Sequence, residues 1–91
     1  MTKADIKKNK IVYYARILKP VGIYEVCELS VRTVHEDYFV GTDKRDKHAY
    51  LFSYNKLDKL VFESRQECLK LVKQAEKNAP KVSDEQEYEE Y

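Results

Sequence analysis

The chain has 91 residues, of which 43% are hydrophobic and 36% are charged. A chain of this length forms one domain with one core that buries roughly two thirds of its unfolded surface, which excludes a cofactor-binding domain beside a separate substrate domain. The formal net charge of +1 hides an uneven distribution, because residues 1–80 carry sixteen basic and eleven acidic side chains, whereas residues 81–91 carry one basic and five acidic side chains. We predict a flexible basic N-terminus at 1–9, a single domain at 10–80 and a disordered acidic tail at 81–91.

No apolar run approaches the roughly 18 residues of a membrane span, and the N-terminus lacks the apolar stretch of a signal peptide. We therefore expect a cytoplasmic protein with no membrane contact. The two cysteines, Cys27 and Cys68, lie in apolar patterns without a CxxC pair or a histidine at ligand spacing. Both are expected to be buried free thiols, and the sequence predicts no metal site and no cofactor.

The first predicted strand, residues 10–19, is rich in β-branched and aromatic residues and has apolar side chains on both faces, which indicates that both faces are covered. Pro20 and Gly22 then mark a turn. A long strand at 23–34 follows, and its apolar positions change parity at Cys27. Such a change indicates a bulge or a sharp bend, as where a strand turns the corner of a small barrel.

Two short strands are predicted at 38–42 and 48–54, joined as a hairpin by a charged segment. A last short strand at 60–63 runs directly into a helix. Ser64 and Glu67 fit the capping box that opens a helix. The helix then carries one apolar stripe, formed by Cys68, Leu71, Val72 and Ala75, and it ends at Asn78 and Pro80.

These elements predict an α+β fold: a small five-stranded antiparallel β-barrel or strongly bent sheet, SH3-like, with a C-terminal α-helix. A flat antiparallel sheet with the helix on one face is the alternative. Either arrangement leaves little internal volume for a substrate.

The stretch "GTDKRDKHAYLFSY", residues 41–54, combines two aspartates, four basic groups and a run of aromatics. One hypothesis is a nuclease-like metal centre built from Asp43, Asp46 and His48. However, neighbouring residues at a hairpin tip splay outward and do not converge as ligands must, and turns favour aspartate. We interpret the stretch as a turn whose basic side chains double as a contact for phosphates or an acidic partner surface.

The aromatic residues allow two interpretations. His48, Tyr50, Phe52 and Tyr54 share one face of their strand and would form a stacking platform interleaved with arginines. Alternatively, Phe39, Leu51 and Phe52 fill the barrel and the tyrosines cover its outside. The predicted partner-binding residues are Arg16, Arg32, Lys44, Arg45, Lys47, His48, Tyr50 and Tyr54.

No sequence feature points to catalysis. The chain has two glycines and no glycine-rich phosphate loop, and no base is placed beside a nucleophile. We therefore expect a protein that is not an enzyme. The acidic tail is interpreted as a solvated end, or alternatively as a polyanion that shields the basic body or occupies a partner's nucleic-acid groove.

The junction Val61-Phe62-Glu63-Ser64-Arg65-Gln66-Glu67-Cys68 follows a V-F-x-[ST]-R-x-E-[AC] pattern. With the preceding strands it resembles small uncharacterised proteins of phages and mobile elements of Gram-positive bacteria. The resemblance implies a domain without catalytic residues that binds a host or phage protein, which includes inhibition of a host nucleic-acid-handling or defence complex such as a CRISPR effector. Direct binding of single-stranded or duplex nucleic acid by the basic body is the alternative, and the oligomeric state stays open.

Overall fold

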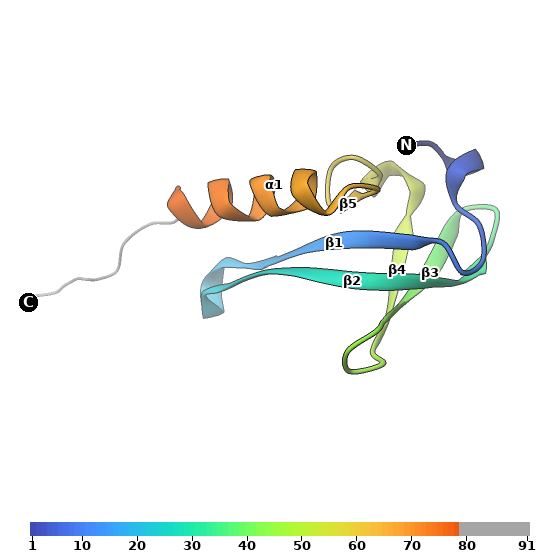
Figure 1. Ribbon diagram of the computed structural model, residues 1–91, viewed down its shortest axis with the longest axis horizontal. Helices are drawn as coiled ribbons and strands as arrows, with labels where there is room; N and C mark the ends of the chain where they lie inside the picture. Colours follow the sequence, from blue (N-terminus) through green and yellow to red (C-terminus); the bar gives the residue numbers. More distant parts are fainter. Residues whose placement is uncertain (79–91) are drawn as a thin grey trace, which may run out of the picture.

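The structure is a computed structural model that describes residues 1–78. It has an α+β fold in which five antiparallel strands form a curled half-barrel with one helix against it (Figure 1). The sheet order is β4-β3-β2-β1-β5. The elements are β1 (Ile11–Leu18), β2 (Ile23–Val34), β3 (Tyr38–Asp43), β4 (Ala49–Ser53), β5 (Val61–Phe62) and α1 (Arg65–Lys77), with short 3-10 turns η1 (Lys3–Asp5), η2 (Lys19–Val21) and η3 (Tyr54–Lys56).

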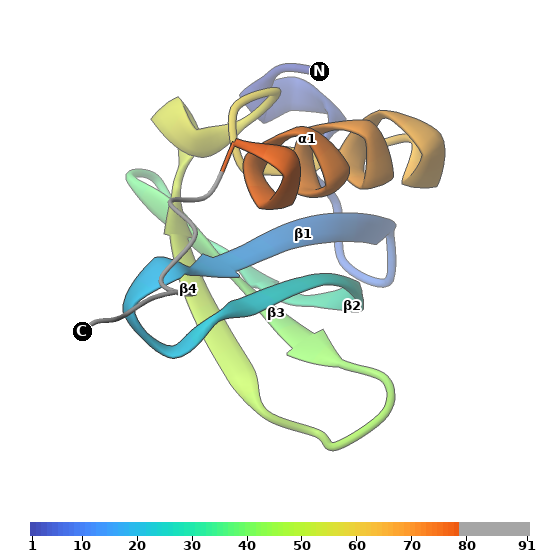
Figure 2. The same ribbon diagram turned by 90° about the vertical axis from the view of Figure 1, so that its left-hand side faces the viewer.

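Strand β1 is covered on both faces, as the sequence predicts. Val12 is buried on the face toward the interior of the half-barrel, and Ala15 is buried on the opposite face, against α1. Alternate residues of a strand point to opposite sides, so each face of β1 serves a different part of the core. In Figure 2, α1 lies along one side of β1, and the β3–β4 hairpin continues the sheet on the other side.

The core accordingly has two clusters. The cluster inside the half-barrel consists of Ile6, Val12, Cys27, Leu29, Val31, Phe39, Phe52 and Val61. The cluster beneath the helix consists of Ala15, Phe62, Cys68 and Val72, with Ile17, Val26 and Leu71 packed beside it. The consecutive residues Val61 and Phe62 enter different clusters, so the two-residue strand β5 joins the layers.

The parity change in β2 has a different cause from the predicted one. Val26 packs beneath α1 and Cys27 faces the half-barrel interior, so the burial changes sides without a bulge at that point. The irregularity of β2 lies further along, where the register to β3 shifts between Val31 and Thr33. A bulge there increases the local bend and twist of the strand, which fits the curl of the sheet.

The predicted helix is confirmed. Ser64 is its N-cap, and the Ser64 side chain accepts a hydrogen bond from the backbone N–H of Glu67 at 3.5 Å. Cys68 and Val72 are buried on the predicted apolar stripe, and Asn78 is the C-cap. Pro80 and the predicted acidic tail lie outside the described residues.

The residues before β1, for which we predicted flexibility, lie against the body. Ile6 is buried in the core of the half-barrel. The Asn9 N–H donates to the Val31 carbonyl and the Val31 N–H donates to the Lys10 carbonyl, each at 2.8 Å. These bonds extend the pairing of β2 and hold the basic N-terminal segment beside the bulge.

Candidate functional site: the β3–β4 hairpin tip

The charged segment between β3 and β4 is a hairpin turn that extends beyond the rest of the sheet (Figures 1 and 2). The Asp43 N–H donates to the His48 carbonyl at 2.8 Å, and the Lys47 N–H donates to the Asp43 carbonyl at 2.9 Å. Lys47 has a left-handed backbone with φ of 66°. These contacts support the interpretation of this stretch as a turn.

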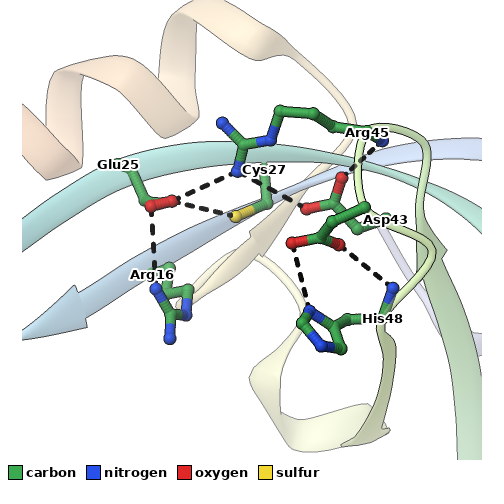
Figure 3. Close-up of polar contacts among 7 residues, drawn as sticks. Arg16, Glu25, Cys27, Asp43, Arg45 and His48 are labelled. Carbon is green, nitrogen blue, oxygen red and sulfur yellow. Dashed lines mark hydrogen bonds and ion pairs between the residues drawn. The ribbon is translucent and has the colours of Figure 1, made fainter.

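Both aspartates of the turn use their carboxylates to close it. Asp43 Oδ1 accepts the Arg45 N–H at 2.7 Å (Figure 3). Asp46 Oδ1 accepts the His48 N–H at 3.0 Å. The hydrogen bond from the His48 backbone holds the pKa of Asp46 below its usual value. Within residues 1–78 no group of three or more histidine, cysteine or acidic side chains is arranged to hold a metal ion. The carboxylates are therefore turn caps.

Asp43 departs from the expectation that the tip residues splay outward, because it is only 2% exposed. The reason is its register: Asp43 is the last residue of β3 and pairs with the fully buried Leu29 of β2. Its Oδ2 atom makes no hydrogen bond in the described part of the chain, and the nearest cation is the Arg45 guanidinium at 3.9 Å. A buried carboxylate therefore lies at the base of the tip and accepts a hydrogen bond from its backbone.

A chain of ion pairs connects the tip to the first two strands (Figure 3). Arg16 of β1 lies 3.6 Å from Glu25 of β2, and the same carboxylate lies 3.3 Å from the Arg45 guanidinium. The hydrogen bond to Glu25 and the charge of Asp43 raise the pKa of Arg45. Because these side chains are partly exposed, the pairs contribute little to the free energy of unfolding. Their effect is to orient the Arg45 side chain.

Cys27 lies beneath this chain of ion pairs, with Sγ 3.9 Å from Glu25 Oε1. Burial, followed by the charges of Glu25 and Asp43, raises the pKa of the Cys27 thiol to about 11. Burial also raises the pKa of Cys68 to about 11. Since the thiolate is the nucleophilic form, both side chains are unreactive near neutral pH, and they are the buried free thiols that the sequence predicts.

A shallow pocket of about 370 Å³ opens beside the tip. Its basic lining residues are Lys44, Arg45 and Arg65, and Lys44 Nζ also pairs with Glu28 at 3.1 Å. Arg65, Glu25 and Glu28 were not among the predicted site residues. They lie in α1 and β2, far from the tip in sequence, and no local motif marks them.

The aromatic platform is largely part of the core. Phe52 is 6% exposed, and its ring centroid lies 4.9 Å from Tyr14 and 5.5 Å from Phe39. Tyr50 packs on the same cluster. The alternative interpretation was right for Phe39 and Phe52 but wrong for Leu51, which is 65% exposed. It was also wrong for Tyr50 and Tyr54, which pack on the interior cluster and do not cover the outside. The face of β4 that carries Tyr50 and Phe52 points inward, so Leu51 points outward.

Two predicted site residues lie away from the tip. The Tyr54 hydroxyl donates to the His35 carbonyl, and its ring packs on Phe39 with the Lys3 ammonium above it. Arg32 lies within the β2 bulge. The structure therefore groups Arg16, Lys44, Arg45, Lys47, His48 and Tyr50 at one side of the half-barrel and leaves Arg32 and Tyr54 elsewhere.

Among residues 1–78, no helix is long and apolar enough to cross a membrane. Comparisons with protein-family models, curated proteins and solved structures found no match to this chain. The fold and the tip define a small α+β half-barrel that carries a closed, charged hairpin.

Proposed function

We propose that this chain is a non-catalytic binding module of phage type that contacts a protein through the hairpin tip. The partner class is a host complex that handles nucleic acid or defends against phage, in the manner of an anti-CRISPR protein. The half-barrel would be an SH3-like domain. The continuous strand order β4-β3-β2-β1-β5 and the bulge in β2 support this finer assignment.

The proposal rests on one observation: the backbone of the hairpin tip is closed by hydrogen bonds while its basic side chains are exposed. Its backbone and both aspartates are bonded within the turn, whereas the side chains of Lys44, Arg45 and His48 are 53%, 68% and 73% exposed. A closed turn loses little conformational entropy on binding, so its exposed basic groups are preorganised for a contact.

The charge around the tip favours a protein over a nucleic acid. Five basic and four acidic side chains gather there, with a formal charge of +1: Arg16, Glu25, Glu28, Asp43, Lys44, Arg45, Asp46, Lys47 and Arg65. A phosphate backbone is bound by cations in excess of nearby acids. A mixed surface of this kind instead complements a protein surface that carries both signs of charge.

The test is affinity purification of the tagged full-length chain from a Gram-positive host lysate, with identification by mass spectrometry. Lys47→Glu reverses a tip charge that has no ion pair in the described residues, and Lys19→Glu makes the same change in the η2 turn. We expect wild type and Lys19→Glu to recover the same protein and Lys47→Glu to recover at least tenfold less. Equal recovery by all three chains would refute the tip as the contact.

Direct nucleic-acid binding is the second candidate, and a different surface favours it. Lys7 and Lys8 lie in the segment that is bonded to Val31, next to Arg32, and none of these three basic residues has an ion pair within residues 1–78. Phosphate contacts predict that the affinity for an oligonucleotide falls steeply with salt. Arg32→Glu should weaken such binding more than Lys59→Glu does, and no binding at low salt would exclude this function.

A further inference from the structure

Strand β4 is an edge strand of the sheet, because β3 is its one neighbour among the described strands. It comprises Ala49, Tyr50, Leu51, Phe52 and Ser53 and carries no charge, proline or register shift. The unpaired backbone groups of an edge strand are a template for another strand, and a charge, a proline or a bulge on the strand is a common protection against such pairing. β4 has none of them.

The hydrogen-bond pattern shows which backbone groups face the open edge. The bond from the Asp43 N–H to the His48 carbonyl marks this pair as hydrogen-bonded. In an antiparallel ladder hydrogen-bonded and non-hydrogen-bonded pairs alternate, so Tyr50 and Phe52 bond to β3. The N–H and C=O groups of Ala49, Leu51 and Ser53 therefore point away from β3, toward the edge. The side chains of these three residues are all exposed.

The strand is also symmetric in side-chain size about its central residue. Leu51 is 65% exposed at the centre, an aromatic residue stands on each side of it, and a small residue stands at each end. An antiparallel copy of the same strand, centred on Leu51, would place small against small and aromatic against aromatic. Val40 of β3 lies beside Leu51 in the sheet, so the outer face of the pair would carry one continuous apolar stripe.

We propose that two copies of this chain associate through their β4 strands, antiparallel about a two-fold axis at Leu51. Ala49 of each copy then lies opposite Ser53 of the other. The backbone groups of Ala49, Leu51 and Ser53 that face the open edge form about six hydrogen bonds between the two copies. The occupant is a second copy because the size pattern of β4 is complementary to itself. The pairing uses the open backbone edge of β4 and the exposed residues Ala49, Leu51 and Ser53, and it uses none of the charged side chains of the tip. This proposal therefore does not depend on the proposed function.

Sedimentation velocity of the full chain from about 1 to 200 µM tests the pairing. We expect wild type to shift from monomer to dimer within this range and Leu51→Lys to need at least tenfold higher concentration. Val21→Lys is the matched control, because Val21 is 67% exposed in the η2 turn and lies outside the sheet. A wild type that stays monomeric throughout, or equal association of both lysine variants, would overturn the proposal.

Cysteine cross-linking tests the register with chains that keep the strand uncharged. Under mild oxidation, Leu51→Cys should form a disulfide-linked dimer because the two residues 51 face each other at the axis. Ser53→Cys alone should not form such a dimer, since the two residues 53 lie about four positions apart along the paired strands. In a mixture, Ser53→Cys should cross-link to Ala49→Cys, because residue 53 of one copy lies opposite residue 49 of the other. Cross-linking of Ser53→Cys alone as efficient as that of Leu51→Cys would contradict this register.

Discussion

Replacement of Asp43 by alanine should destabilise the domain far more than replacement of Asp46, although both aspartates cap the same turn. Each accepts one backbone N–H, at 2.7 Å and 3.0 Å. They differ in burial: Asp43 is 2% exposed, whereas the Asp46 side chain is 42% exposed. In Asp46→Ala, water can bond to the N–H group that loses its acceptor. In Asp43→Ala, the bond is lost at a buried carboxylate, where water does not replace it fully.

The magnitude follows from the kind of hydrogen bond that is lost. A hydrogen bond to a charged group contributes about 1.5–3 kcal/mol, so Asp43→Ala should lower the free energy of unfolding by roughly that amount. Asp43→Asn keeps an oxygen acceptor for the Arg45 N–H and should lose less. The loss for Asp46→Ala should be the smallest of the three, because solvent satisfies the freed N–H of His48.

Urea unfolding followed by circular dichroism measures these differences, provided that the denaturant slope is the same for all variants. Amide hydrogen exchange adds a local measurement, since Arg45 should lose protection in Asp43→Ala and keep it in Asp46→Ala. Equal destabilisation by the two alanine variants would show that the burial of Asp43 does not strengthen its bond. The bond to Asp43 would then add no more to the free energy of unfolding than the exposed bond to Asp46 does.

Three further predictions concern the sheet, the helix and the thiols. Gly41→Ala should destabilise the domain by about 1–3 kcal/mol in urea unfolding, because its Cβ would lie 3.2 Å from the Cδ1 atom of the fully buried Leu29; an unchanged midpoint would contradict the packing. Ser64→Ala should cost about 1 kcal/mol through loss of the N-cap, and a Ser64→Asp variant should restore it. The thiols of Cys27 and Cys68 have pKa values raised from 9.0 to about 11. The stability that they contribute is therefore complete below pH 9 and is lost as the pH rises to 11. The double variant Cys27→Ala/Cys68→Ala should lose less stability between pH 9 and pH 11 than wild type, and an equal loss would exclude the thiols as the cause.

Local sequence determined the elements of this protein. Ser64 and Glu67 place the start of the helix because an N-cap acts within one turn. The two-sided apolar pattern of residues 10–19 requires a covered strand whatever covers it, and Val12 and Ala15 are buried on opposite faces. The turn at the tip was also predictable, since Asp43 and Asp46 bond to backbone groups two residues further along the chain.

The tertiary structure decided which side of each strand faces the core and which charges meet. Leu51 and Phe52 are neighbouring apolar residues, and only the curl of the sheet makes Phe52 interior and Leu51 exposed. Arg45 and Glu25 lie twenty residues apart and meet because β2 pairs with the end of β3, where Leu29 lies opposite Asp43. Local patterns record the preferences of short segments, whereas burial and ion pairing depend on the segments that the fold brings alongside, and these are distant in sequence.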